Sequence, residues 1–243
     1  MHICQPEIYE TIIPTQTNLF RESFLRRTSD FFRRQFVGQE PDSHRDWPTI
    51  LRDDCCFEQA RNLPALCAGY DQPITFSPDN WNGCFVTFVS QDPLRKPRRE
   101  GQRFSVASPW GFSAPSMRKK AGNLKIWPVI EGLCERGYGV YLTDAAKLYF
   151  HDANHLKFTS TVDLEKEALR REMQAIDAAC VVALGRRAEK DLMGFGIPCV
   201  FHPHPAAYPS TIQKHYGIEH VTSSAVANAM LLDILDDLGT RSC

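Results

Sequence analysis

The sequence predicts an α/β fold, a three-layer α/β/α sandwich around a central, mostly parallel four-stranded sheet. Four short runs are apolar on both faces, which is typical of strands in a parallel sheet that is covered on both sides. Helical patterns separate these runs, and strand–helix alternation of this kind gives an open sandwich. The chain has 243 residues, of which 43% are apolar and 23% charged, as in an ordinary globular protein with room for one sizeable α/β domain or two small ones.

The four predicted strands lie in the part of the chain that follows residue 83. Each run is too short for a helix, and its apolar residues do not alternate with polar ones. The runs are CFVTFVS (84–90), GVYLT (139–143), CVVALG (180–185) and PCVFH (198–202).

Three helical segments separate or follow these strands. LKIWPVIEGLCERG (124–137) ends in Gly137, a plausible helix stop, and RRAEKDLMGFG (186–196) stops at Gly194 or Gly196. In TVDLEKEALRREMQAIDAA (161–179), Thr161 is a candidate N-cap, and the charged residues are expected to face water. The side chains expected to face inward are those of Leu164, Ala168, Met173 and Ile176.

Residues 1–80 lack the regular strand–helix alternation of the rest of the sequence. We expect a helical and irregular extension that packs on the core, with residues 81–243 forming the α/β/α domain. NLFRESFLRRTSDFFRRQF (18–36) has a helical pattern and predicts an amphipathic helix docked on that domain. Its phenylalanines on about one face are Phe20, Phe24, Phe31 and Phe36.

Composition limits the partners and the compartment. The net charge is −1, so a nucleic acid must be held by a local basic patch. No apolar run approaches about 18 residues, and no secretory signal is recognised at the N-terminus. The nine cysteines form no Cys-x-x-Cys pair, which favours a reducing, intracellular compartment and argues against a metal or iron–sulfur site.

Polar residues follow the predicted strands. The residues at and just after the carboxyl ends of the four strands are Ser90–Pro93, Thr143–Lys147, Leu184–Arg186 and His202–Pro205. The carboxyl ends of parallel strands share one edge of the sheet, where binding sites form. Two carboxylates and two histidines therefore converge there, and this composition indicates a hydrolytic or binding site.

Five motifs in this order resemble the uracil-DNA glycosylase superfamily over about residues 84–216. Gln91-Asp92-Pro93 resembles its water-activating turn, and Arg103-Phe104-Ser105-Val106 resembles the following segment that carries an aromatic ring. VYLTDAAK (140–147) is similar to the strand whose end reads the base. LGRRAEKDL (184–192) is similar to the start of a family helix, and HPHP (202–205) resembles the loop that supplies the catalytic histidine.

The resemblance implies that a base is flipped out of DNA into a pocket. Asp92 is then expected to stabilise the oxocarbenium-like sugar and orient water, and His202 to donate a hydrogen bond to the departing base. Phe104 supplies a stacking face, and Gln91, Leu94 and Asp144 contact the base.

The resemblance also implies how DNA is held. The partner is single- or double-stranded DNA with a modified base, and neither a cofactor nor a metal is expected. We expect a monomer, because flipping enzymes of this size commonly act alone. The residues expected to contact DNA are Arg95, Lys96, Arg98, Arg99, Ser108, His204 and Tyr208, with Arg103 also in the basic run.

Three positions depart from the family pattern. Leu94 stands where a bulky tyrosine often excludes a 5-methyl group, and Tyr208 stands near the place of an apolar wedge. Asp144 stands where an asparagine reads uracil. An ionised Asp144 only accepts hydrogen bonds and suits a base edge with N–H groups, whereas a protonated Asp144 mimics asparagine.

Three functions remain open at this point. The leading one is a monofunctional DNA glycosylase that hydrolyses the N-glycosidic bond of uracil or a related damaged or deaminated base. The second is a non-catalytic DNA-binding protein that retains the fold. The third is a hydrolase of free nucleosides or nucleotides, favoured by the near-neutral net charge.

Overall fold

A central sheet of six strands organises the computed structural model, which describes residues 1–42, 47–56, 67–91, 105–150 and 159–240. The strand order is β1-β3-β6-β4-β8-β9. In that order the strands are His2–Ile3, Ile74–Ser77, Gly139–Asp144, Phe85–Ser90, Ala178–Leu184 and Val200–His202.

The four strands predicted from the sequence are β4, β6, β8 and β9, and they pair in parallel. The predicted number of four strands is wrong, because β3 adds to β6 in antiparallel orientation and β1 adds to β3 in the same way. These two strands lie in irregular parts of residues 1–80, where no apolar run marks a strand and Pro73 and Pro78 flank β3. The sheet is therefore mixed, with a parallel part and an antiparallel edge.

A second sheet has the strand order β5-β2-β7. Its strands are Ser105–Ala107, Cys67–Asp71 and Leu148–Phe150. β2 pairs in parallel with β5 and in antiparallel orientation with β7. This sheet joins the N-terminal part of the chain to the segment that follows β6.

Among the described residues, the α-helices are α1 (Pro6–Ile12), α2 (Glu22–Phe36), α4 (Pro115–Arg118), α5 (Trp127–Glu135), α6 (Thr159–Ala175), α7 (Arg186–Gly194), α8 (Pro209–Tyr216) and α9 (Ser223–Thr240). Short 3₁₀ helices are η1 (Ile13–Gln16), η2 (Arg52–Asp54), η4 (Pro109–Gly111) and η5 (Asn123–Lys125). Within the described ranges, none of the helices has the length and hydrophobicity needed to cross a membrane.

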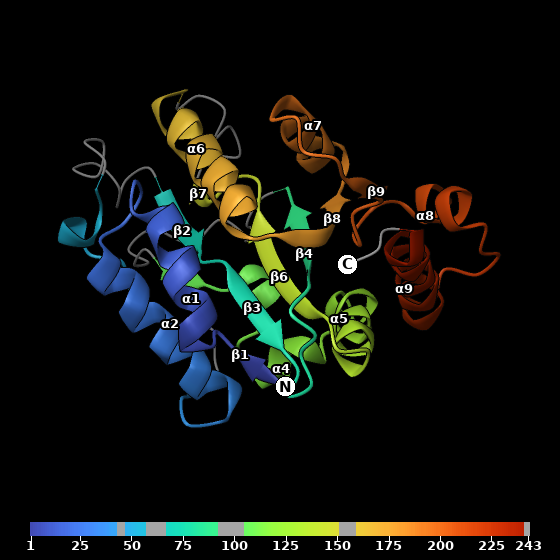
Figure 1. Ribbon diagram of the computed structural model, residues 1–243, viewed down its shortest axis with the longest axis horizontal. Coiled ribbons are helices and arrows are strands. Elements are labelled where there is room, and N and C mark those ends of the chain that lie inside the picture. The colour runs from blue at the N-terminus through green and yellow to red at the C-terminus, as the bar shows by residue number, and fades with distance from the viewer. Residues whose placement is uncertain (43–46, 57–66, 92–104, 151–158, 241–243) are drawn as a thin grey trace.

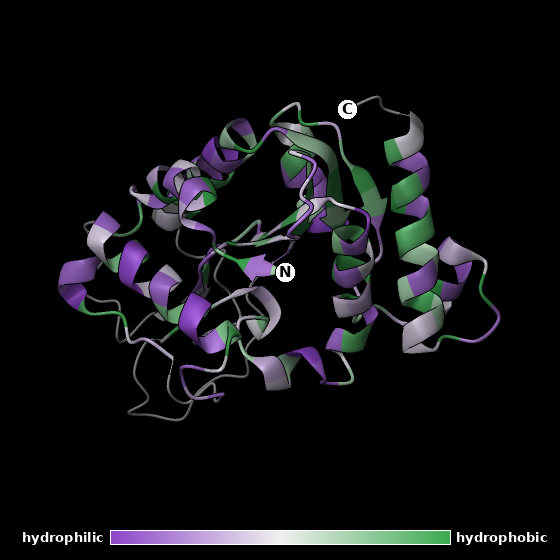
Figure 2. Ribbon diagram, turned by 60° about the horizontal axis from the view of Figure 1, so that its bottom comes forward, coloured by the Kyte–Doolittle hydropathy of each residue, from purple (hydrophilic) through white to green (hydrophobic). Residues whose placement is uncertain are grey.

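Helices lie on both sides of the central strands, as the α/β/α prediction requires. Figure 1 shows α1 and α6 on one side of the strands and α5 and α9 on the other. α9 contacts α5 and β8, whereas α6 contacts α1 and η1. The helix ribbons in Figure 2 carry both hydrophilic and hydrophobic residues, which is the pattern of helices with one face on a core.

Alternation along the strands divides the core between the two helical layers. Val89, Val181 and Ala183 belong to a buried cluster with Leu169 of α6 and Leu192 of α7. The alternate strand positions belong to the larger cluster, with apolar residues of α5 and α9. These positions are Val86, Phe88, Val140, Leu142, Cys180, Val182 and Leu184. Successive strand residues therefore face opposite helical layers.

The amphipathic helix predicted near the N-terminus is α2. Phe24 and Phe32 are buried, whereas Phe31 and Phe36 are half-buried, so Phe32 replaces Phe31 on the inward face. Phe20 is buried just before the helix. β1 and β3 both come from residues 1–80 and pair within the central sheet. A boundary at residue 80 between extension and domain stays a prediction.

Two expectations for the segment 161–179 need correction. Thr161 lies inside α6 instead of capping it, because the helix includes Thr159. Ala168 and Ile176 are buried as expected, but so are the charged residues Glu165 and Glu172. A periodic pattern assigns charged residues to water, and only knowledge of their partners explains their burial.

Candidate functional site at the carboxyl edge of the sheet

The ends of β4 and β6 lie side by side. Ser90 pairs with Asp144 in the strand register. Beyond the register, the backbone N–H of Ala145 donates to the carbonyl of Ser90 at 2.7 Å, and that of Ala146 donates to the carbonyl of Gln91 at 3.0 Å. Gln91 and Asp144 are therefore brought to the same edge of the sheet.

The ends of β8 and β9 continue this edge. Leu184 pairs with His202, and the backbone N–H of Gly185 donates to the carbonyl of His202 at 2.9 Å. Gln91 packs against Gly185, since a Cβ atom at Gly185 would lie 3.1 Å from Gln91 Oε1. A continuous row therefore joins Asp144, Gln91 and His202 along the carboxyl ends of the four parallel strands.

Gly185 is needed for this row, and alanine there should disturb it. Gly185 has φ 99° and ψ 159°, a conformation that only glycine adopts easily. We expect Gly185→Ala to destabilise the fold by about 1–3 kcal/mol and to displace the Gln91 side chain. Urea unfolding measures the first effect. Gly194→Ala is the matched control, because a Cβ there meets no atom within 4 Å and no left-handed φ is involved; equal losses in both variants would contradict the argument.

Asp144 is buried with a hydroxyl partner. Its residue exposure is 2%, and the Ser90 hydroxyl donates a hydrogen bond to its Oδ1 atom. Both side chains leave the same face of the sheet because the two residues are register partners. Ser90 was not predicted as a site residue, although the pairing of parallel strand ends would have indicated it.

His202 is a buried, neutral imidazole. Its exposure is 1%, and its Nδ1 atom lies 2.9 Å from the Tyr216 hydroxyl, with the two rings stacked at 25°. Its buried Nε2 atom has no hydrogen-bond partner in the described part of the chain. Burial, and then the nearby His215, lower the pKa of His202 to about 4. The ring is therefore uncharged at pH 7.

Tyr216 can set the tautomer of His202. Burial raises the pKa of Tyr216, so its hydroxyl keeps its proton. When that O–H donates to Nδ1, the proton of the neutral ring is on Nε2, and Nε2 becomes the donor toward a ligand. Sequence reasoning missed Tyr216, because it lies in α8, 14 residues after His202, in no recognisable motif.

The same histidine belongs to a group that could hold a metal ion. One donor atom each of His202, His215 and Asp233 lies within 4.8 Å of the others. Imidazole nitrogens and a carboxylate oxygen suit Zn²⁺. A metal at this place would occupy the ring that the sequence assigns to base release, so the expectation of a metal-free reaction stays a prediction.

The residues predicted to contact DNA differ in exposure. Tyr208 is 82% exposed directly before α8, where it can meet a macromolecule. His204 is half-buried, and its Nδ1 atom accepts from the N–H of Ala206 at 3.1 Å. Ser108 is fully buried, and its hydroxyl oxygen accepts from the N–H of Ser113 at 3.0 Å. The prediction that Ser108 contacts a phosphate does not fit this burial.

The remaining predicted site residues lie between positions 92 and 104, outside the described residues. Their roles therefore stay predictions. They are the catalytic Asp92, the base-binding Leu94 and Phe104, and the DNA-binding Arg95, Lys96, Arg98 and Arg99.

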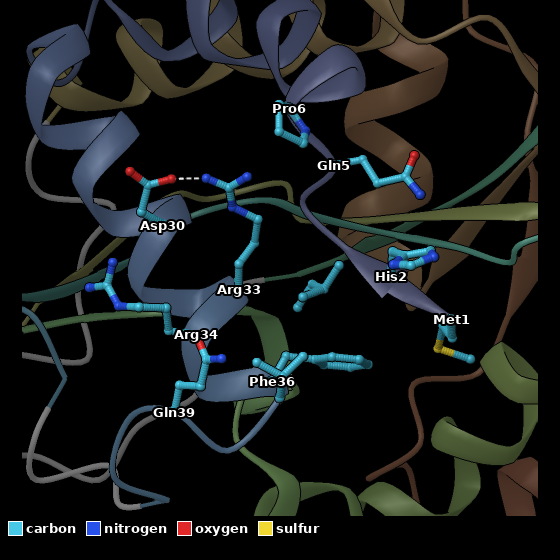
Figure 3. A pocket seen from close by; sticks show the side chains of 11 residues that line it. Met1, His2, Gln5, Pro6, Asp30, Arg33, Arg34, Phe36 and Gln39 are labelled. Carbon is cyan, nitrogen blue, oxygen red and sulfur yellow. Dashed lines mark hydrogen bonds and ion pairs between the residues drawn. The ribbon is translucent and has the colours of Figure 1, made fainter.

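A pocket of about 580 Å³ lies elsewhere, between β1 and α2. Figure 3 shows Asp30, Arg33 and Arg34 of α2 beside Met1 and His2. His2 pairs with Ser77, at the end of β3 that lies beside the amino end of β6. The pocket is therefore at the opposite end of the strands from Asp144 and His202, and it contains none of the predicted site residues.

The strand-end residues Asp144, Gln91 and His202 lie in a segment that matches a known protein family. A family model described as the uracil DNA glycosylase superfamily matches residues 83–218, more than half of the chain. The matched segment contains Gln91, Asp144 and His202. No curated protein matches the sequence significantly.

Proposed function

Because the chain belongs to the uracil-DNA glycosylase superfamily, we propose that it is a monofunctional DNA glycosylase. Its substrate is DNA that contains uracil or a related damaged or deaminated base. The protein flips this base out of the strand and hydrolyses its N-glycosidic bond. The superfamily match supports a glycosylase-like activity, and the choice of base and the retention of turnover are parts of the proposal.

One observation carries the proposal. A neutral, buried imidazole lies at the carboxyl end of β9, with its Nε2 atom unpartnered in the described structure, on the edge that also holds Asp144 and Gln91. A neutral N–H donor that is fixed before the reaction stabilises negative charge without the cost of reorganising water. This is the group that a departing, anionic base requires.

In the proposed reaction, the bond between C1′ of the sugar and the base nitrogen breaks, and its electron pair leaves with the base. His202 Nε2–H donates a hydrogen bond to the base oxygen on which negative charge develops. The carboxylate of Asp92 stabilises the sugar cation and orients a water molecule. The water oxygen bonds to C1′ and loses a proton, while the base is released and takes up a proton.

The base is held by residues from three parts of the chain. Phe104 stacks on its face, Gln91 and Leu94 border it, and Asp144 reads its edge. The basic run around Arg95–Arg99 binds phosphates of the DNA backbone. His204, in the same loop as His202, and Tyr208, shortly after it, also contact the DNA. No metal or cofactor takes part in the proposed reaction.

In the proposed function, Asp144 determines which base is recognised. The Ser90 hydroxyl donates to its Oδ1 atom. An ionised Asp144 only accepts hydrogen bonds, so it suits a base edge that presents N–H groups. Such a carboxylate opposes the O4 atom of uracil. The two forms of the proposal are therefore an altered base preference with ionised Asp144, or uracil recognition by a protonated Asp144.

The test is base release from defined oligonucleotides with EDTA present throughout. Labelled single- and double-stranded DNA carries uracil, hypoxanthine, 5-hydroxymethyluracil or a thymine mismatch, and alkali then cleaves at abasic sites. Strand breaks are the expected result. Retarded mobility without breaks would favour a non-catalytic DNA-binding protein, and base release from free nucleosides alone would favour a nucleoside hydrolase. Activity that EDTA abolishes would contradict the metal-free mechanism.

A further inference from the structure

A fully buried ion pair lies directly behind the end of β6. Lys147 and Glu172 have side-chain exposures of 0%, and their charged atoms are 2.7 Å apart. Lys147 follows β6 in the chain, whereas Glu172 lies in α6. A buried pair of this kind adds little net stability over apolar residues of similar volume, because both charges are removed from water. What it provides is a defined geometry for the groups that it contacts.

The pair is hydrogen-bonded to Thr143. The Thr143 hydroxyl donates to Glu172 Oε2 at 2.6 Å, and Lys147 Nζ donates to the Thr143 hydroxyl oxygen. Thr143 immediately precedes Asp144, and its side chain leaves the opposite face of the strand. One peptide unit therefore separates the buried pair from the residue that is proposed to read the base.

Helix α6 also forms a hydrogen bond with the backbone of the segment 143–147. A carboxylate oxygen of Glu165 accepts from the backbone N–H of Lys147 at 2.8 Å, and Glu165 is buried. Glu165 and Glu172 are seven residues apart, which places them two turns apart on one face of the helix. The two carboxylates thus hold the segment 143–147 through a backbone group and through two side chains.

The N-terminal part of the chain completes the arrangement. The Gln16 side-chain amide, from η1, donates to Glu172 Oε1, and Gln16 Oε1 accepts from the Tyr70 hydroxyl at 3.0 Å. Gln16 and Tyr70 are both buried. Gln16 lies outside the segment that the family model matches, yet it contacts the carboxylate that holds β6.

We propose that Gln16, Glu172, Lys147 and Thr143, with Glu165, form a buried polar clamp that positions Asp144 for base recognition. The proposal rests on the proposed function, since it assigns these residues to the same site. None of them touches the base, so they are positioning residues. Through Gln16, residues that precede the matched segment contribute to the geometry of the site.

The clamp should control where the Asp144 carboxylate meets the base. A displacement of about 1 Å at a reacting or recognising group lowers rates up to about a hundredfold. Loss of one clamp contact should therefore reduce the rate of base release more than the affinity for DNA, because phosphate contacts dominate affinity.

Two variants test the clamp at its two ends. Gln16→Met removes the amide that contacts Glu172 at similar volume, and Thr143→Val removes the hydroxyl without changing the shape of the side chain. Asn18→Leu is the matched control: Asn18 Nδ2 donates to the carbonyl of Leu164 at 2.7 Å, so it also ties the N-terminal part to α6 but does not contact the clamp. If Gln16→Met fails to fold, Thr143→Val still tests the link to β6.

Three quantities are measured: the single-turnover rate constant for base release, the Kd for uncleaved DNA, and hydrogen exchange of the amides of residues 145–147. In both clamp variants we expect a rate constant reduced roughly tenfold or more, a Kd within about twofold, and amide exchange at least about tenfold faster. Asn18→Leu should change none of them to this extent.

Unchanged amide exchange in both clamp variants would overturn the positioning role, as would a rate loss equal to that of Asn18→Leu. Amide exchange does not depend on turnover. A wild-type chain that releases no base would thus contradict the proposed function, while the exchange measurement would still decide whether the clamp holds the end of β6.

Discussion

We expect His202→Ala to lower the single-turnover rate constant for base release by about 10²–10³-fold, the usual cost of removing one preorganised donor to a developing anion. In the proposed reaction the neutral ring donates from Nε2, and alanine would leave the departing base without this hydrogen bond. The affinity for DNA should change little, because the proposed phosphate contacts, which dominate affinity, would remain. Rapid-quench measurement of base release, with the Kd measured separately, distinguishes the two effects.

Two further variants sharpen this result. His220→Ala is the matched control, since His220 is exposed and lies outside the segment that the family model matches, and it should retain full activity. Tyr216→Phe keeps the stacked ring but removes the hydroxyl at 2.9 Å from Nδ1, and we expect a smaller loss than for His202→Ala. A His202→Ala variant with wild-type rates would exclude His202 from catalysis.

The buried His202 also predicts a dependence of stability on pH. Its pKa is about 4 in the folded protein, below the ordinary value of 6.5, because burial disfavours the charged ring. As the pH falls, the imidazole is protonated in the unfolded chain at a higher pH than in the folded protein. The free energy of unfolding is therefore unaffected by the protonation of His202 above about pH 6.5 and decreases as the pH falls from 6.5 toward 4. The decrease amounts to about 3 kcal/mol. Urea unfolding at pH 7.5 and 4.5 should show a smaller decrease in His202→Asn than in the wild type.

Asp144→Asn is expected to increase uracil excision by about a hundredfold if Asp144 is ionised in the wild type, because a site that offers the wrong hydrogen-bond pattern rejects a base by 10²-fold or more. The amide donates to uracil O4 and accepts from N3–H, whereas the carboxylate only accepts. The measurement is the ratio of kcat/KM for uracil to that for the base that the wild type prefers.

The outcome decides between the two forms of the specificity proposal. An unchanged or lower rate on uracil would count against the ionised form and favour a protonated Asp144. Ser90→Ala provides the comparison, because it removes the donor to Oδ1 without introducing an amide. A gain in uracil excision by Ser90→Ala as large as that of Asp144→Asn would show that the hydrogen bond, and not the amide, controls the preference.

The parallel part of the sheet was predictable because each of its strands lies in an apolar run of five to seven residues and helical patterns separate most of these runs. β4, β6, β8 and β9 all lie where the sequence predicts them. β1 and β3 escaped prediction because they lie among irregular segments, where Pro73 and Pro78 flank β3 and no apolar run marks a strand. Their pairing depends on contacts between segments that are distant in sequence, which a local hydrophobic periodicity cannot indicate.

The shared edge of the sheet was predictable where chain order and motif coincide, as for the placement of Gln91, Asp144 and His202, whose roles stay predictions. Ser90 and Tyr216 were missed because their roles come from a strand register and from a helix packed beside the ring. Glu172 was assigned to solvent because its charge dominated the helical pattern, although its partners come from β6 and the N-terminal part. The contact with Gln16 joins residues 156 positions apart, and the contact with Thr143 joins residues 29 apart, so no local pattern indicates either.

The placement of β3 beside β6 has a consequence for any shortened form of the chain. A protein that starts at residue 81 would lack β3, and the backbone groups of β6 on that side would lose their antiparallel partners. An open strand edge recruits other chains and promotes aggregation. Isolating only the family-matched region would therefore yield self-associating material, and its poor behaviour should not be mistaken for a lack of enzymatic competence.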